Sequence, residues 1–271
     1  MRPPISRVGV FDSGVGGLTV LRALVQLLPH ESFIYVGDTA RVPYGSKSPE
    51  AVRRFSLEIA RFFRRKGVKM MVTACNTASA LALPDLRAFM PVPVIGVIEP
   101  GARAALASTR SGRVGIIGTV ATIRSQAYDH ALKRLDKTVR VFSRPCPLFV
   151  PLVEEGWMSH EVTRHVAGIY LRPLLKHKID SLVLGCTHYP LLKPILRRVA
   201  GKVELIDSAE ETAKAVRSRL EQGGLLLHGR KKGRVAYFSS DDPDTFAQLG
   251  ARFMGQSLAK VQRIRLEGID Q

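Results

Sequence analysis

Short apolar runs alternate with helix-forming stretches along almost the whole chain, and this alternation restricts the fold more than any other feature. The first run, 8–11, leads into a glycine turn and a helical stretch over 17–28. The other runs predicted as buried strands are 33–36, 69–74, 92–97, 114–117, 139–142, 181–184, 203–206, 235–238 and 260–266. Strands that alternate with helices are typical of mainly parallel sheets in α/β proteins. We therefore expect the α/β class.

One helix is predicted in more detail than the others. Pro49 suits the first turn of a helix, and Ser48 before it suits the N-cap. Arginines fill one face of the segment that follows, and the other face carries Val52, Phe55, Ile59, Phe62 and Phe63. This division predicts an amphipathic helix that lies on a sheet.

A weak internal repeat runs through the pattern. The similar segments are 7–13 and 113–119, 72–77 and 183–188, and less clearly 94–99 and 203–210. Because they keep their order and nearly their spacing, the simplest interpretation is two related α/β halves; chance similarity between apolar strands is the alternative. Each half places one cysteine, Cys75 or Cys186, at the carboxyl end of a strand. Open α/β sheets bind ligands outside those ends, so two facing halves would bring both cysteines to one cleft.

The C-terminal part indicates how the halves are divided along the chain. From about residue 210 the sequence predicts a long helix, a basic turn over 228–234, and then a strand, a helix and a last strand, without a linker or low-complexity segment. We expect this tail to complete the first half. The predicted domains are 1–98 plus 208–271, and 99–207, with the active site in the cleft between them.

Charge and cysteine content limit the classes of function. The 271 residues include three cysteines and carry a formal net charge of +18. So few cysteines argue against a disulfide framework and favour a reducing cytoplasm. No signal-peptide pattern is found, and no apolar run reaches the roughly 18 residues of a membrane span. The charge fits a nucleic-acid partner, a surface that attracts small anions, or a merely solvated basic surface, because a diffuse excess identifies no groove.

Cys75 and Cys186 each end an apolar strand and precede small polar residues. A disulfide needs α-carbons within about 7 Å. Zinc needs about four ligands at short spacing, more than Cys186 and His188 supply. A single thiol nucleophile leaves the second thiol without a role. Buried structural cysteine is the plain alternative, and it suits Cys146, which has no matching context.

Two thiols on opposite sides of one carbon have a different use. One, as thiolate, takes a proton from one face, and the other, as thiol, gives a proton to the opposite face, so that the carbon is inverted. The usual cysteine pKa of about 8.5 falls beside polar donors or helix N-termini, which makes both forms accessible near neutral pH. Because the roles swap with direction, the site must be nearly symmetric, and the internal repeat would supply that symmetry.

The turn over 12–17 follows the first strand and opens a helix, as a dinucleotide-binding turn does. Thr19 stands where the third glycine of that fingerprint belongs, so no dinucleotide is predicted. The backbone amides of such a turn bind anions, for example a substrate carboxylate. Asp12 is interpreted as an ammonium ligand, a thiol-tuning group or a turn cap. The loop 37–45 suits a functional loop, and His188 suits a proton partner of Cys186 or a structural histidine.

Four segments resemble the glutamate racemases of the aspartate/glutamate racemase superfamily: 10–20, 35–45, 74–79 and 184–191. The resemblance covers essentially the whole chain. It implies two α/β domains with pseudo-twofold symmetry, a homodimer, and no pyridoxal phosphate, flavin or metal. The implied activity is interconversion of L- and D-glutamate, which supplies D-glutamate for peptidoglycan. An aspartate racemase is the alternative enzyme, and a basic nucleic-acid-associated binding protein is the alternative of another class.

The same resemblance implies roles for single residues. Cys75 would deprotonate D-glutamate with support from Asp12, and Cys186 would deprotonate L-glutamate with support from His188. Glu154 matches a further supporting acidic position. The implied substrate contacts are Asp12, Ser13, Tyr44, Gly45, Asn76, Thr77, Thr187 and His188, with Thr119 and Thr122 as further carboxylate contacts.

Overall fold

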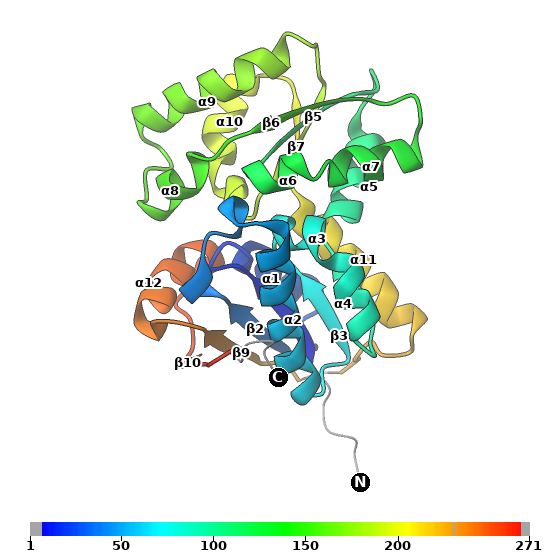
Figure 1. Cartoon of the computed structure of the whole chain (residues 1–271), viewed down its shortest axis with the longest axis vertical. Coiled ribbons are helices and arrows are strands. Elements are labelled where there is room, and N and C mark those ends of the chain that lie inside the picture. The colour runs from blue at the N-terminus through cyan, green and yellow to red at the C-terminus, as the bar shows by residue number, and fades with distance from the viewer. Residues whose placement is uncertain (1–6, 230, 267–271) are drawn as a thin grey trace.

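Two parallel sheets, one in each lobe of the molecule, organise the chain (Figure 1). The computed structural model describes residues 7–229 and 231–266. The first sheet has six strands in the order β10-β9-β2-β1-β3-β4, and the second has four in the order β6-β5-β7-β8. Neighbouring strands are parallel in both sheets. The predicted α/β class with two parallel-sheet domains is therefore confirmed.

Each strand predicted from the sequence is present with similar bounds. The first sheet contains β1 (Val8–Asp12), β2 (Phe33–Gly37), β3 (Met70–Thr73), β4 (Val94–Gly96), β9 (Val235–Ser239) and β10 (Val261–Arg263). The second sheet contains β5 (Arg113–Gly118), β6 (Arg140–Pro145), β7 (Ser181–Gly185) and β8 (Glu204–Ile206). The central strands β1, β2, β3 and β7 are buried along their whole length, which explains why they are continuous apolar runs without alternation.

The second sheet repeats a strand order that is present in the first. The order β2-β1-β3-β4 corresponds to β6-β5-β7-β8, and β9 and β10 extend the first sheet beyond β2. β1 pairs with β2 and β3, as β5 pairs with β6 and β7. The internal repeat in the sequence therefore reflects two copies of one arrangement. β3 and β7, which precede Cys75 and Cys186, occupy matching places.

Helices cover both sheets and meet where the lobes join (Figure 1). The first lobe contains α1 (Leu18–Leu27), α2 (Pro49–Arg65), α3 (Asn76–Leu81), α4 (Leu83–Phe89), α11 (Ser208–Gln222), α12 (Pro243–Met254) and the 3-10 helices η1 (Thr39–Arg41) and η2 (Tyr44–Ser46). The second contains α5 (Ile98–Ser108), α6 (Val120–Arg124), α7 (Ala127–Leu135), α8 (Phe149–Glu154), α9 (Glu161–Leu175), α10 (Lys193–Ala200) and η3 (Tyr189–Leu192). α11 packs against α1 and α5 and so links the lobes. Within the described ranges, no helix is both long and apolar enough to cross a bilayer.

The helix predicted from Pro49 is α2. The Ala51 amide donates to Ser48 Oγ at 3.3 Å, so Ser48 is the N-cap, as predicted. The apolar face packs on the first sheet through the buried residues Val52, Ile59, Phe62 and Phe63. Phe55 is only partly buried and lies under the Arg41 guanidinium, 4.2 Å from carbon to ring centre.

Candidate active site

The structure brings the two strand-end thiols to one cavity. Ala74 and then Cys75 follow the end of β3, and Cys186 directly follows β7. Both border a cavity of about 30 Å³ between the lobes. Its other walls are Ser13, Val42, Pro43, Tyr44, Gly45, Asn76, Thr77, Thr119, Val150, Thr187 and His188. Cys146 is a free, buried cysteine that does not border this cavity.

The first thiol is enclosed by the N-terminus of α3 and by Ser13. The Ala78 amide donates to Cys75 Sγ at 3.5 Å, and the thiol donates to Ser13 Oγ at 3.8 Å. Burial, and next the carboxyl group of Asp12, raise the pKa of Cys75 to about 12. The sequence predicted the opposite direction from the polar neighbours alone. Burial outweighs their hydrogen bonds, so Cys75 is a thiol in this closed site.

Asp12 lies behind the first thiol and does not border the cavity. It ends β1, is fully buried, and accepts a hydrogen bond from the Gly14 amide at Oδ2 over 3.0 Å. Oδ1 has no hydrogen-bond partner within the described ranges. Burial raises the pKa of Asp12, and the charge of His188 opposes this rise. A Cβ on Gly17 would lie 2.4 Å from Asp12 Cβ, so glycine is required for α1 to start this close to the carboxyl group.

The second thiol has a histidine as its neighbour. Cys186 Sγ lies 3.9 Å from His188 Nδ1, and His188 Nε2 lies 2.9 Å from Glu154 Oε1. Phe253 of α12 packs edge-on against the His188 ring, with 5.2 Å between centres. Burial lowers the pKa of His188, but the hydrogen bonds with Cys186 and Glu154 outweigh burial and raise it to about 10. A positive ring therefore lies beside Cys186 at neutral pH.

Hydroxyl groups from both lobes meet at the cavity wall. Thr77 Oγ1 lies 3.0 Å from Thr119 Oγ1 and 3.2 Å from Thr122 Oγ1, and the last two are 2.9 Å apart. Thr77 and Thr119 border the cavity, whereas Thr122 supports them from behind. Thr187 also borders it, and its carbonyl accepts from Thr19 Oγ1 at 3.3 Å.

The loop after β2 closes one side of the cavity. Tyr44 Oη donates to the Asp38 carboxylate, and burial raises the pKa of Tyr44 well above its usual value. A Cβ on Gly45 would lie 2.6 Å from Thr119 Cβ, so glycine permits η2 to touch the second lobe. Val42 and Pro43 belong to the predicted functional loop but were not assigned to the site. Val150 of α8 was missed, because a single apolar residue on a helix carries no signal for a site.

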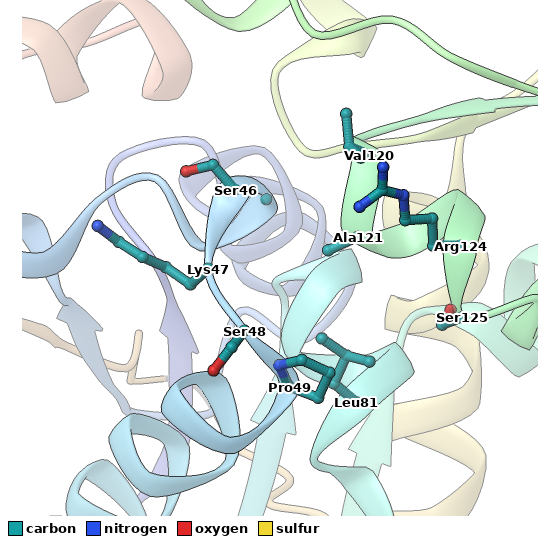
Figure 2. A pocket seen from close by; sticks show the side chains of 10 residues that line it. Ser46, Lys47, Ser48, Pro49, Leu81, Val120, Ala121, Arg124 and Ser125 are labelled. Atoms are coloured by element: carbon teal, nitrogen blue, oxygen red, sulfur yellow. The ribbon is translucent and has the colours of Figure 1, made fainter.

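The site is closed in this structure. A cavity of about 30 Å³ holds about two water molecules, at about 10–15 Å³ each, and is too small for an amino acid with two carboxylates. A larger hollow of about 440 Å³ lies on the outer side of η2, next to α6 (Figure 2). Lys47 and Arg124 stand on its two sides, and Gly45 borders both spaces. η2 therefore separates the closed site from the larger hollow.

Two matching α/β lobes that each bring one thiol to a shared cavity define an amino-acid racemase, an isomerase that acts on a small molecule. Residues 8–216 match the sequence profile of the Asp/Glu/hydantoin racemases. The chain belongs to this family.

Similar proteins extend over nearly the full length. A glutamate racemase from Geobacter metallireducens is 55% identical over 265 residues, which cover 97% of this chain and 98% of the relative. The crystal structure of the glutamate racemase isoform RacE1 from Bacillus anthracis has a TM-score of 0.93 and 40% identity, with 96% and 98% covered. A glutamate racemase from Francisella tularensis, in complex with D-glutamate, has a TM-score of 0.91 and 36% identity, with 97% and 98% covered.

Proposed function

We propose that the protein interconverts L- and D-glutamate without a cofactor and supplies D-glutamate for peptidoglycan synthesis. The observation that carries this proposal is the pair of thiols, Cys75 and Cys186, at matching strand ends and in one cavity. The choice of glutamate as the substrate is supported by the relatives, which are named glutamate racemases and match this chain over nearly their full length. It is also supported by the D-glutamate bound to the Francisella tularensis protein.

The two thiols exchange roles with the direction of the reaction. From L-glutamate, the Cys186 thiolate takes the α-proton, and the bond between that proton and the α-carbon breaks. The Cys75 thiol then gives its proton to the opposite face of the carbanion. Cys186 ends as a thiol and Cys75 as a thiolate, so no proton is gained or lost in the site. D-glutamate starts from the second arrangement and reverses each step.

The supporting groups differ between the two halves and fit these starting forms. The positive ring of His188 lies beside Cys186, and a neighbouring positive charge favours the thiolate of a cysteine. Cys75 has its pKa raised to about 12 and is therefore a proton donor in this structure. The ammonium group of the substrate brings a positive charge close to Cys75 and Asp12, and this charge favours their ionised forms when D-glutamate is bound.

Polar groups of the cavity wall hold the two carboxylates of the substrate. The hydroxyls and amides assigned to this task are those of Ser13, Gly45, Asn76, Thr77, Thr119, Thr187 and His188. Tyr44 contributes its ring and backbone, because its hydroxyl is engaged by Asp38. Asp12, Thr122 and Glu154 act through Cys75, Thr77 and His188, respectively. We assign no metal and no cofactor to the site.

The domain division, the oligomeric state and the location of the enzyme are further parts of the proposal. We propose domains 1–98 plus 208–271 and 99–207; residues 1–6, 230 and 267–271 of these ranges lie outside the described part of the chain. We also propose a homodimer and a cytoplasmic location, and the three free cysteines support the latter. Sedimentation of the pure protein tests the dimer. A nucleic-acid partner rests on the net charge of +18 alone, and we do not propose one.

Circular dichroism of L-glutamate incubated with the pure protein tests the proposed activity. The signal should decay to zero as the mixture becomes racemic, without added cofactor and after exhaustive dialysis against a chelator. L-Aspartate is run in parallel. Faster racemisation of aspartate would favour the alternative enzyme. Activity that dialysis removes and that metal or pyridoxal phosphate restores would contradict the cofactor-independent mechanism.

A further inference from the structure

Asn76 borders the cavity and also forms a buried hydrogen bond with a residue that does not border it. Its Oδ1 accepts from Tyr128 Oη at 2.7 Å. Asn76 is the first residue of α3 and directly follows Cys75, whereas Tyr128 lies in α7 of the other lobe. The hydrogen bond therefore joins the two lobes immediately beside the first thiol.

The other end of the Asn76 amide has no partner. Nδ2 is buried and forms no hydrogen bond within the described ranges, while the residue itself borders the cavity. A buried donor without a partner is unfavourable, and in a functional site it commonly awaits a ligand. Nδ2 can give hydrogen bonds and cannot accept them, so the ligand group that suits it is an acceptor such as a carboxylate oxygen.

Tyr128 is itself held in one position. The residue is 2% exposed. A Cβ on Gly185 would lie 3.2 Å from Cε2 of the ring, and a Cβ on Gly101 would lie 3.3 Å from Cε1 and from the hydroxyl. Burial raises the pKa of Tyr128, while a hydrogen bond with the Ser208 hydroxyl opposes this rise, so the phenol stays neutral and remains a donor. Gly185 directly precedes Cys186, so the Tyr128 ring lies beside the end of β7, next to the second thiol. Its hydroxyl donates to Asn76, the residue that follows the first thiol.

We infer that Tyr128 is a positioning residue, whose phenol fixes the Asn76 amide in the orientation that presents Nδ2 to a substrate carboxylate. A flipped amide would present its carbonyl oxygen to the carboxylate, and two acceptors repel each other. Because the phenol comes from the other lobe, the orientation is set only when the lobes are together as in this structure. The inference rests on the proposed glutamate site and names one more residue that serves it.

Tyr128→Phe tests the inference, since it removes the hydroxyl and keeps the ring. The racemisation rate of glutamate, followed by circular dichroism, gives KM and kcat for wild type and variant. We expect KM to rise about tenfold, because a buried acceptor loses its donor and the amide its fixed orientation. We expect kcat to fall as well, because Asn76 directly follows Cys75 and the carboxylate that it binds therefore lies close to the reacting carbon, where negative charge develops in the transition state. Each variant is assayed well below its own melting temperature, so that loss of fold does not enter.

Tyr189→Phe is the matched control. Tyr189 is equally buried, and its hydroxyl donates to the Cys146 carbonyl at 2.8 Å; within the described ranges it forms no hydrogen bond with Asn76. Its KM should be unchanged. A double-mutant cycle then asks whether Tyr128 acts through Asn76: in an Asn76→Ala background, Tyr128→Phe should change KM by less than about twofold.

Three results would overturn the inference. An unchanged KM in Tyr128→Phe, an equal rise in Tyr189→Phe, or a full tenfold effect in the Asn76→Ala background would each show that Tyr128 does not position the amide. A wild-type protein that leaves the glutamate signal unchanged would overturn the proposed function as well, and is thereby distinguished from failure of the positioning role alone.

Discussion

His188 and Glu154 form a partly buried pair, in which Nε2 of the ring lies 2.9 Å from Oε1 of the carboxylate. The other ring nitrogen faces Cys186 Sγ at 3.9 Å. Although burial lowers the pKa of His188, the two partners raise it to about 10. A histidine with a raised pKa keeps its charge below that value and loses it above. His188 is therefore positive from neutral pH up to about 10, and its support of a Cys186 thiolate is present over the same range.

Glu154→Gln should narrow that range. The amide carries no charge, so the pKa of His188 falls and the ring loses its proton at a lower pH. In the pH profile of kcat/KM, the alkaline limb should move to lower pH by about one unit, as for a loss of about 1.4 kcal/mol, so the rate should drop about twofold near pH 9 and nearly tenfold near pH 11. Glu155→Gln is the control, because Glu155 is exposed. An alkaline limb that does not move in Glu154→Gln would show that the carboxylate does not act through His188.

Replacing either strand-end thiol should abolish racemisation. A serine hydroxyl has a far higher pKa than a thiol, so Cys75→Ser and Cys186→Ser each lose a group that takes and gives a proton. We expect kcat to fall by about 10²–10⁴-fold in each, with the melting temperature nearly unchanged. Cys146→Ser should keep its activity, since Cys146 does not border the cavity. More than about a tenth of wild-type turnover in either of the first two variants would refute the two-thiol mechanism.

The fold was predictable because each level of the sequence agrees with the next. Apolar runs at the spacing of α/β units gave the strands, and Ser48 with Pro49 gave the start of α2. The matched segments around Cys75 and Cys186 predicted one cavity, since equivalent strands end at equivalent edges. These are local patterns, and the elements that they predict are kept in the folded protein because helices pack on both faces of each sheet.

The closeness of the two lobes could not be predicted in the same way. Folding reverses the expected pKa change of Cys75, because the thiol becomes buried. It also pairs Tyr128 with Asn76 over 52 positions in the chain. A tyrosine at the start of an amphipathic helix looks like a core residue, and nothing in its own segment indicates a partner. Val150 could not be predicted in the cavity wall for the same reason, because nothing in its own segment indicates that it faces the other lobe.

Gly45→Ala should hinder closure of the lobes. A Cβ at this position would lie 2.6 Å from Thr119 Cβ, closer than carbon atoms approach without a shift of the backbone. The contact exists only when η2 meets the second lobe, so the folded lobes themselves are not strained. We expect kcat/KM for glutamate to fall at least about tenfold, while the melting temperature changes by less than about 2 °C. Gly229→Ala is the control, since a Cβ there meets nothing within 4 Å. Equal activity of the two variants would contradict the need for this close approach.

Isotope exchange should show which face receives a solvent proton. When L-glutamate reacts in deuterium oxide, the Cys186 thiolate keeps the substrate proton and the Cys75 thiol delivers a deuteron. At low conversion, deuterium should be found almost wholly in the D product and hardly at all in the recovered L substrate, as measured by mass spectrometry after chiral separation. A single base on one face would return part of the original proton to the product. Equal labelling of substrate and product would therefore contradict two separate thiols.

Racemisation rates cannot show which thiol acts on which enantiomer, because the equilibrium constant fixes the ratio of the rates in the two directions. The assignment therefore needs a reaction that uses only one of the two thiols. L- and D-glutamate are equally stable, so kcat/KM must be the same in both directions for every variant. A glutamate analogue with a leaving group on the β-carbon avoids this constraint, since removal of the α-proton expels the leaving group and no second thiol is needed. Cys186→Ser keeps Cys75 and should eliminate from the D analogue alone.

Cys75→Ser should eliminate from the L analogue alone, because only Cys186 remains to take a proton and it faces the other side of the carbon. The released keto acid is measured with each pure enantiomer in each variant, and at least about a hundredfold preference is expected, the usual contribution of one positioned base. A reversed preference in both variants would show that the roles of Cys75 and Cys186 are exchanged while the geometry holds. If each variant instead acted on both enantiomers equally, the two thiols could not lie on opposite faces, and the symmetry of the strand ends would have no part in the chemistry.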